Sequence, residues 1–243
     1  MKKVIAIVQA RMGSTRLPGK VMCDLIGKPM IVHEIERVLR SECIGSVVIA
    51  TTQLPADDVI VQLCKDRAWN YYRGDEQDVL DRYYHAAKKF GADVIVRLTA
   101  DCPLIEPSVI DLVIKQFCLN YPHIDYASNV FPQRTFPLGL DTEIMTMEAL
   151  EKSWKYETNS ALREHVTQHI VKNPENFHIS GITNKQDFSG LRWTVDTKED
   201  FLFVREVYSF FGHNQFSWTD VLDLIKAKPE LSLINKNSRQ KEV

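Results

Sequence analysis

The feature that most constrains the fold is an alternation of two sequence patterns between Lys3 and about Cys118. Short runs rich in β-branched residues alternate there with stretches that have the spacing of amphipathic helices. Such alternation predicts a parallel sheet whose strands are joined by right-handed helical crossovers. The expected strands are Val4–Val8, Ser46–Ala50, Trp69–Tyr72 and Val94–Leu98, and the expected helices are Met30–Arg40, Asp57–Arg67, Val79–Phe90 and Ser108–Cys118.

The second half of the chain is less regular and predicts a mixed, mostly parallel sheet. The fold class is therefore α/β, with three layers in the order α/β/α. The segment Phe131–Leu140 has no helical or strand period and is a candidate substrate-facing loop, whereas the polar end Asn235–Val243 is expected to fray. The expected strands here are Tyr126–Asn129, Asp141–Met145, Phe177–Ile182 and Leu191–Val195, and the expected helices are Met147–Tyr156, Ser160–Val171, Lys198–Phe211 and Thr219–Ala227.

Length and charge exclude several classes of protein. A chain of 243 residues with 44% hydrophobic content can bury a substantial core, and a single domain is expected. A net charge of −2 argues against coating nucleic acid and against binding anionic membranes. No apolar run approaches the roughly 20 residues of a membrane span, so a cytoplasmic location is expected. The five cysteines form no C-x-x-C pair and are expected to be reduced.

The stretch Gln9–Lys20 follows the first expected strand and brings three cations and two glycines. Ligands bind at the carboxyl ends of strands in open α/β sheets, where glycines let the backbone approach a phosphate and Arg or Lys neutralises it. No G-x-G-x-x-G follows the strand. A Walker A loop is excluded too, because five residues instead of four separate Gly13 from Gly19, and Val21 replaces the Ser or Thr. The stretch is therefore either a phosphate-binding loop of another kind or an ordinary solvated connection.

Two carboxylates stand at the ends of expected strands. Asp101 follows Val94–Leu98 and can hold Mg²⁺ against a triphosphate, although an Asp before a Cys-Pro pair can also be a simple turn former. Asp196 follows Leu191–Val195 at the start of an expected helix, where either Asp196 or Thr197 can be the N-cap.

Three further clusters are candidates for binding. Asp141 and Glu143 alternate onto one face of a strand, which is either an active-site face or a solvated one. His165 and His169 have helical i,i+4 spacing, but no third ligand accompanies them and zinc is rejected. Arg82 can reach a base or phosphate, or form an exposed pair with Asp78.

The string A-R-x-x-S-x-R-x-P-G-K over Ala10–Lys20 resembles the amino-terminal signature of sugar cytidylyltransferases. With Gln9 before it, the motif is similar to that of the spore-coat polysaccharide biosynthesis branch of the acylneuraminate cytidylyltransferase type. The likeness continues through the Asp101 segment, where Ala100 replaces the family's glycine, and through V-D-T-x-E-D at Val195–Asp200.

The resemblance implies a single nucleotide-diphospho-sugar transferase (GT-A-like) domain that joins CTP to an acidic sugar, giving a CMP-sugar and pyrophosphate. It implies a nucleotide-binding half over about residues 1–120 and an acceptor-sugar half, with a possible homodimer surface, over about 121–230. The alternatives are a glycosyltransferase of similar fold and a non-catalytic nucleotide-binding protein. The residues implied in catalysis are Arg11, Lys20, Asp101 and Asp196, with Asp101 and Asp196 holding Mg²⁺. Those implied on the nucleotide are Gln9, Ala10, Arg11, Gly13, Ser14, Arg16, Lys20 and Arg82, and those implied on the sugar are Asp141, Glu143, Arg163 and His165.

Overall fold

The computed structural model describes residues 2–239 and contains a seven-stranded mixed sheet with the strand order β5-β4-β1-β6-β8-β7-β9. The first four strands of that order are parallel, β8 is antiparallel to both β6 and β7, and β9 is parallel to β7. A small hairpin, β2–β3, stands apart. The strands are β1 Val4–Gln9, β2 Asp24–Leu25, β3 Lys28–Pro29, β4 Ser46–Thr52, β5 Asn70–Gly74, β6 Val94–Thr99, β7 Tyr126–Ser128, β8 Glu143–Thr146 and β9 Ile179–Gly181.

Helices cover both faces of this sheet, which confirms the predicted α/β/α fold class. The α-helices of the described part are α1 Met30–Val38, α2 Asp58–Asp66, α3 Val79–Phe90, α4 Pro107–Asn120, α5 Met147–Tyr156, α6 Ser160–Glu164, α7 Gln168–Lys172, α8 Lys198–Phe211 and α9 Trp218–Ala227. Short 3₁₀ helices are η1 Lys20–Met22, η2 Pro55–Asp57 and η3 Pro229–Leu233.

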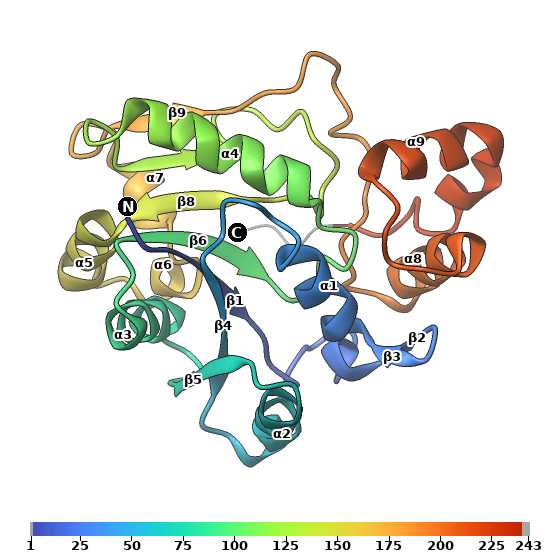
Figure 1. Ribbon diagram of the computed structural model, residues 1–243, viewed down its shortest axis with the longest axis horizontal. Helices are drawn as coiled ribbons and strands as arrows, with labels where there is room; N and C mark the ends of the chain where they lie inside the picture. The colour runs from blue at the N-terminus through green and yellow to red at the C-terminus, as the bar shows by residue number, and fades with distance from the viewer. Residues whose placement is uncertain (1, 240–243) are drawn as a thin grey trace.

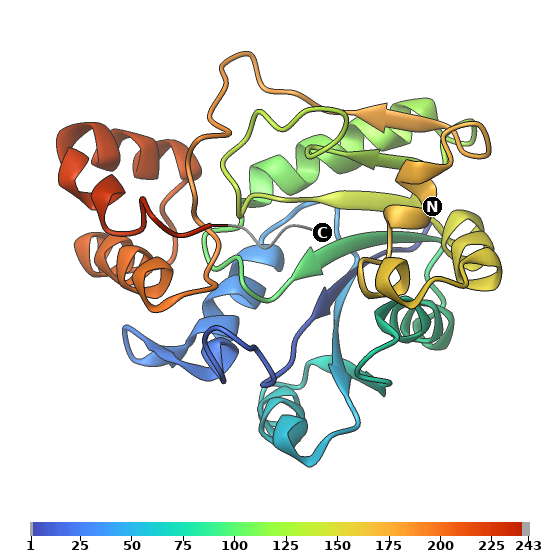
Figure 2. The same ribbon diagram turned by 180° about the vertical axis from the view of Figure 1, so that it is seen from behind.

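Three hydrophobic clusters correspond to this layering. One face of the sheet packs against α1, α2 and α4, and the other packs against α3, α5 and α7. A third cluster joins α8, α9 and η3 to the start of α1 and to the buried Trp193. Figures 1 and 2 show α8 and α9 together at one end of the molecule, beyond α1, so that the last part of the chain closes one side of the sheet.

Most predicted elements are confirmed, with ends that differ by no more than two residues. The strand predicted at Leu191–Val195 is wrong: the segment makes a single bridge, between Leu138 and Arg192. Gly139, at φ +113°, explains the close crossing, since a Cβ there would lie 2.7 Å from the backbone nitrogen of Thr194. The segment therefore crosses the end of the sheet instead of joining it.

The single helix predicted at Ser160–Val171 is also wrong, because α6 and α7 are separate helices. The chain breaks at Val166, whose φ of +53° is strained for a β-branched residue. Burial of the Val166 side chain among the residues of the second hydrophobic cluster stabilises this conformation. His165, the C-cap of α6, and His169, within α7, consequently do not share one helical face.

The end of the described chain is fixed by hydrogen bonds where fraying was predicted. Asn235 is 6% exposed, and its side-chain amide donates to the carbonyl of Arg192 and to Asp200 Oδ1, both at 3.0 Å. The rest of the predicted frayed segment, 240–243, lies outside the described residues. None of the helices within 2–239 has the length and apolar character needed to cross a membrane.

Candidate active site

The site begins where β1 and β6 end side by side. Gln9 and Thr99 are register partners in this parallel pair, and the amide of Ala100 donates to the carbonyl of Gln9 at 3.0 Å. The loop after β1 and the loop that carries Asp101 therefore leave the sheet at the same edge, as expected for parallel strands. The first loop is held in place by Asp57, whose Oδ1 accepts from the amide of Met12 at 2.7 Å.

Asp196 reaches this edge through the segment that crosses the sheet end. The amide of Val195 donates to the carbonyl of Asp101 at 2.8 Å, so the two carboxylate-bearing segments are joined by their backbones. The N-cap of α8 is Thr197, which forms a reciprocal capping box with Asp200. The interpretation of Asp196 as the helix cap is thus excluded, and its carboxylate is available for other contacts.

Lys20 lies between the two carboxylates. Its Nζ is 3.1 Å from Asp101 Oδ2 and 2.9 Å from Asp196 Oδ1, and it donates to the carbonyl of Val195 at 2.6 Å. Burial alone would lower the pKa of Lys20 and raise that of Asp196. Attraction to Asp101 and Asp196 outweighs burial for Lys20, and attraction to Lys20, Arg16 and Arg192 outweighs it for Asp196. The pKa of Lys20 is raised and that of Asp196 is lowered, so the two groups are charged around neutral pH.

Two residues that sequence reasoning missed complete this cluster. Thr99 donates its hydroxyl to Asp101 Oδ1 at 2.7 Å and so orients that carboxylate. Arg192 contacts Asp196 Oδ2 at 2.8 Å, on the oxygen that Arg16 also contacts at 2.9 Å. Their signal in the sequence was proximity to the two aspartates, since Thr99 lies two residues before Asp101 and Arg192 four before Asp196.

The donor set is compatible with a hard divalent cation. Mg²⁺ binds through one or two carboxylates together with substrate phosphates and water. Within residues 2–239 no group of three or more His, Cys, Asp or Glu side chains could form an all-protein cage. Asp101 and Asp196 instead share a cation, the Lys20 ammonium, which shows that the pair is spaced to bind one positive charge together.

The rest of the predicted nucleotide-binding set lies toward α3. Gln9, Ala10, Arg11 and Arg82 line one depression of about 60 Å³ together with Glu164. Arg11 is paired loosely with acidic residues, at 3.5 Å from Glu76 and 3.8 Å from Glu164. A Cβ on Gly13 would lie 3.2 Å from Glu76, and the amide of Ser14 donates within its own loop to the carbonyl of Met12.

Arg82 is almost completely buried. One guanidinium nitrogen donates to the carbonyl of Asp75 at 2.9 Å, and Nε has no partner among the described residues. The exposed Asp78–Arg82 pair considered from the sequence is not formed; Asp78 pairs with Arg163 instead. Arg82 therefore places a buried cation in the wall of the depression, and its role toward a nucleotide stays a prediction.

Asp141 and Glu143 take different environments. Arg134 forms a two-pronged ion pair with Asp141, using Nη1 for Oδ1 and Nη2 for Oδ2. Glu143 is buried, with Oε2 paired to Arg97 and Oε1 accepting from the hydroxyls of Tyr126 and Thr167. Burial would raise the pKa of Glu143, but these partners hold it below the ordinary value. Both roles toward a sugar stay predictions.

Arg163 and His165 were predicted to hold an acidic group of the acceptor. The structure gives Arg163 other contacts: Nε donates to Asp78 Oδ2 at 2.8 Å, and Nη1 donates to the carbonyls of Trp154 and Glu157. His165 is half-buried at the end of α6. His169 lies against Glu157 at 3.0 Å.

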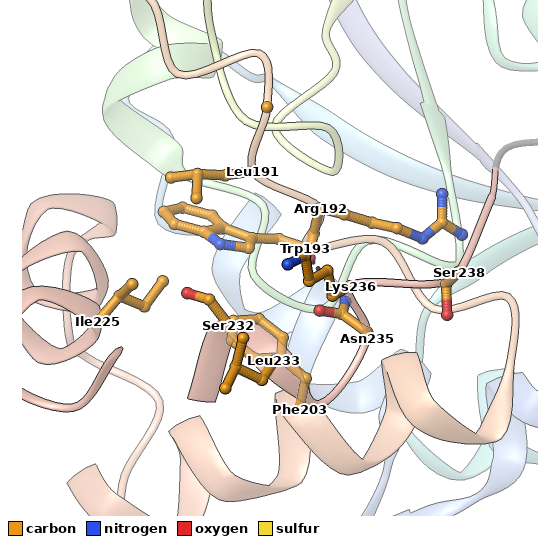
Figure 3. Close-up of a pocket in the computed structure, with 11 residues that line it drawn as sticks. Leu191, Arg192, Trp193, Phe203, Ile225, Ser232, Leu233, Asn235, Lys236 and Ser238 are labelled. Atoms are coloured by element: carbon orange, nitrogen blue, oxygen red, sulfur yellow. Dashed lines mark hydrogen bonds between the residues drawn. The ribbon is translucent and has the colours of Figure 1, made fainter. Parts of the chain in front are cut away.

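A larger cavity adjoins the cluster on the other side of Arg192. Figure 3 shows Trp193 and Leu191 on one side of it, Phe203 of α8 below, and Asn235 and Ser238 of the chain end beside Arg192. Its volume is about 360 Å³. Neither Asp101 nor Lys20 lines it, so it is adjacent to the carboxylate cluster and distinct from it.

The comparisons with known proteins agree with this geometry. A family model described as cytidylyltransferase matches residues 5–231. A solved cytidylyltransferase from Leptospira borgpetersenii serovar Hardjo-bovis is 36% identical, covers 100% of both chains and superposes with a TM-score of 0.92. The spore coat polysaccharide biosynthesis protein SpsF of Bacillus subtilis is 29% identical over 95% of this chain and 97% of its own.

A more distant structure shares the fold. CMP:2-keto-3-deoxy-manno-octonic acid synthetase, solved in complex with CTP, is 21% identical, covers 85% of this chain and 98% of its own, and has a TM-score of 0.66. The family match extends over nearly the whole chain and includes both carboxylate segments and the opening loop. The chain belongs to the cytidylyltransferase family and is a nucleotidyltransferase.

Proposed function

We propose that the protein transfers the cytidylyl group of CTP to a hydroxyl of an acidic sugar, giving a CMP-sugar and pyrophosphate for surface polysaccharide biosynthesis. The observation that carries this proposal is the convergence of Asp101, Asp196 and Lys20 at the carboxyl edge of β1 and β6. Support from relatives comes from the distant synthetase that was solved with CTP and from the Bacillus spore coat protein.

In this reaction the sugar hydroxyl oxygen bonds to the α-phosphorus while the bond from that phosphorus to the pyrophosphate oxygen breaks. The hydroxyl proton passes to solvent, and pyrophosphate leaves with the electron pair of the broken bond. Such chemistry needs positioning and neutralisation of charge instead of a covalent nucleophile. Mg²⁺ held by Asp101 and Asp196 would supply charge neutralisation at the phosphates.

The chain's own cations take complementary roles. Lys20 and Arg16 approach Asp196 from the opening loop, and Arg11 lies at the depression beside Gln9. With a triphosphate present, the Lys20 ammonium can exchange its carboxylate partners for phosphate oxygens without leaving the cluster. Charge-assisted contacts of this kind contribute about 1.5–3 kcal/mol each.

The test is release of pyrophosphate from each of the four ribonucleoside triphosphates, with Mg²⁺ and a panel of acidic and neutral sugars. We expect release only with CTP and only in the presence of an acidic sugar. Release with a neutral sugar alone would contradict the substrate class, and release with another triphosphate would contradict the base. Hydrolysis or transfer from CDP-, UDP- or GDP-sugars would favour a glycosyltransferase, and tight CTP binding without turnover would favour a non-catalytic protein.

A further inference from the structure

A carboxyl group is buried directly behind the candidate site and has no role in the proposed chemistry. Glu34 of α1 is 0% exposed, and its neighbours along the helix, Ile31, Val32 and Ile35, belong to the hydrophobic cluster on that face of the sheet. One carboxyl oxygen, Oε1, has no partner among the described residues. An apolar side chain would fill this place without the cost of burying an incompletely bonded polar group.

The other oxygen of Glu34 makes one specific contact. Oε2 accepts from the backbone amide of Cys102 at 3.0 Å. One turn later on the same helix, Arg37 donates to the carbonyl of Ile105 and pairs with Glu106 at 3.1 Å. The helix α1 therefore holds the loop after β6 at two points, and the first of them is adjacent to Asp101.

The peptide unit between Asp101 and Cys102 is held from both sides. Its N–H donates to Glu34, while its carbonyl accepts from the amide of Val195 at 2.8 Å and from the hydroxyl of Thr194 at 3.2 Å. A peptide unit is planar, so fixing its two polar ends fixes the rotation of the plane about the chain. That rotation helps to set the direction in which the Asp101 side chain leaves the backbone.

We infer that Glu34 is a positioning residue for the metal and nucleotide: by accepting from the amide of Cys102, it sets the direction of the Asp101 carboxylate toward Asp196. The inference rests on the proposed function, because it assumes that Asp101 contacts the Mg²⁺ of a bound triphosphate. Groups that orient metal ligands through one hydrogen bond commonly change metal affinity about 10- to 100-fold when removed.

The experiment measures the Kd of CTP by calorimetry, with Mg²⁺ and with EDTA, in Glu34→Gln and Glu34→Leu. Gln keeps an acceptor for the Cys102 amide, whereas Leu removes it. Mg²⁺ should increase the affinity of the wild type for CTP. We expect this increase to be about tenfold smaller in Glu34→Leu, with the affinity in EDTA unchanged. Glu34→Gln should retain the gain. Ile60→Ala, a deletion in the buried face of α2, controls for loss of stability alone.

The outcomes separate the alternatives. The inference is overturned if Mg²⁺ increases the CTP affinity of Glu34→Leu as much as that of the wild type, or if Ile60→Ala loses as much of this increase as Glu34→Leu does. An equal loss in Glu34→Gln also overturns it, because the charge of Glu34 and not its hydrogen bond would then matter. If Glu34→Leu does not fold, Thr194→Val tests the same peptide unit from its other side, and an unchanged gain there overturns the inference. Wild-type protein that does not bind CTP would refute the proposed function instead.

Discussion

Two of the charged clusters in the described part of the molecule are built differently. The first, called here the loop cluster, consists of Lys20, Asp101 and Asp196. The second, the strand cluster, consists of Arg97, Glu143 and the two hydroxyl groups that Glu143 accepts from. Arg97 and Glu143 are register partners on β6 and β8, whereas each member of the loop cluster lies outside the strands of the sheet.

Exposure separates the two clusters at Asp101, whose side chain is 27% exposed, against 8% for that of Glu143. Lys20 and Asp196, at 10% and 12%, are as buried as Arg97 at 16%. A side chain on a paired strand cannot move without breaking the ladder, but a lysine on a loop can change partners while its carboxylates stay in place. Under the proposed function, similar charge pairing serves as a binding site that can change partners in the loop cluster and as a fixed contact between strands in the strand cluster.

The largest effect should come from neutralising the carboxylates of the loop cluster. We expect Asp101→Asn and Asp196→Asn each to lower pyrophosphate release by about two to three orders of magnitude in a protein that still folds, because a shared metal supplies several kcal/mol of charge stabilisation. The double variant should be little worse than either single one, since residues that act as a unit are not additive.

Titration of activity with Mg²⁺ for these three variants sharpens the comparison. Losses that multiply in the double variant would contradict a shared metal. An active Asp196→Asn would contradict it as well and would direct attention to Asp141, whose carboxylate is already held by Arg134. The same titration on Asp223→Asn, an exposed partner of Lys226, serves as the control for loss of a surface carboxylate.

A substitution in the strand cluster should lower the free energy of unfolding. Glu143→Gln leaves the buried Arg97 without its counter-charge, and removing one partner of a buried ion pair costs about 3–5 kcal/mol. Urea unfolding should show this loss, whereas Asp223→Asn should cost under about 1 kcal/mol. A higher KM for the sugar with unchanged unfolding would contradict this stability effect and would favour the sugar contact that the resemblance implies for Glu143.

The two clusters also differ in how far the sequence predicts them. Asp101 and Asp196 each follow a recognisable apolar run, and the motif resemblance gave both, together with Lys20. The pairing of Arg97 with Glu143 depends on β8 lying antiparallel beside β6, which follows from tertiary packing. Glu34 gave no signal at all, because a carboxyl inside an amphipathic helix pattern resembles a solvated position until the loop behind it is known.

Errors in the predicted elements have the same origin. The apolar run Leu191–Val195 has the composition of a strand, but it crosses the end of the sheet because Gly139 allows close backbone contact. The helical period over Ser160–Val171 continues through Val166, yet the positive φ of that residue ends the helix, and its burial compensates the strain. The local sequence pattern predicts neither the backbone crossing at Gly139 nor the burial of Val166, because both depend on contacts with distant parts of the chain.

The smallest effect we predict separates two glutamates on one helix. Burial raises the pKa of Glu34 well above its ordinary value of 4.5, whereas Lys28 holds the pKa of the half-buried Glu36 below that value against the opposing effect of burial. A raised pKa means that the folded state binds the proton more tightly than the unfolded state, so the contribution of Glu34 to stability falls as pH rises above 4.5.

Glu34→Gln cannot lose a proton and should therefore gain in Tm relative to the wild type as pH rises from about 4.5 to 7, by a few degrees at most. Glu36→Gln should behave in the opposite way, with a Tm below the wild type at neutral pH and a deficit that shrinks as pH falls through the lowered pKa. Melting curves across this range decide the matter. If the Tm difference between Glu34→Gln and the wild type does not change with pH, the Glu34 carboxyl is ionised in the folded protein. Lys20 would then have to neutralise a third carboxylate beside Asp101 and Asp196.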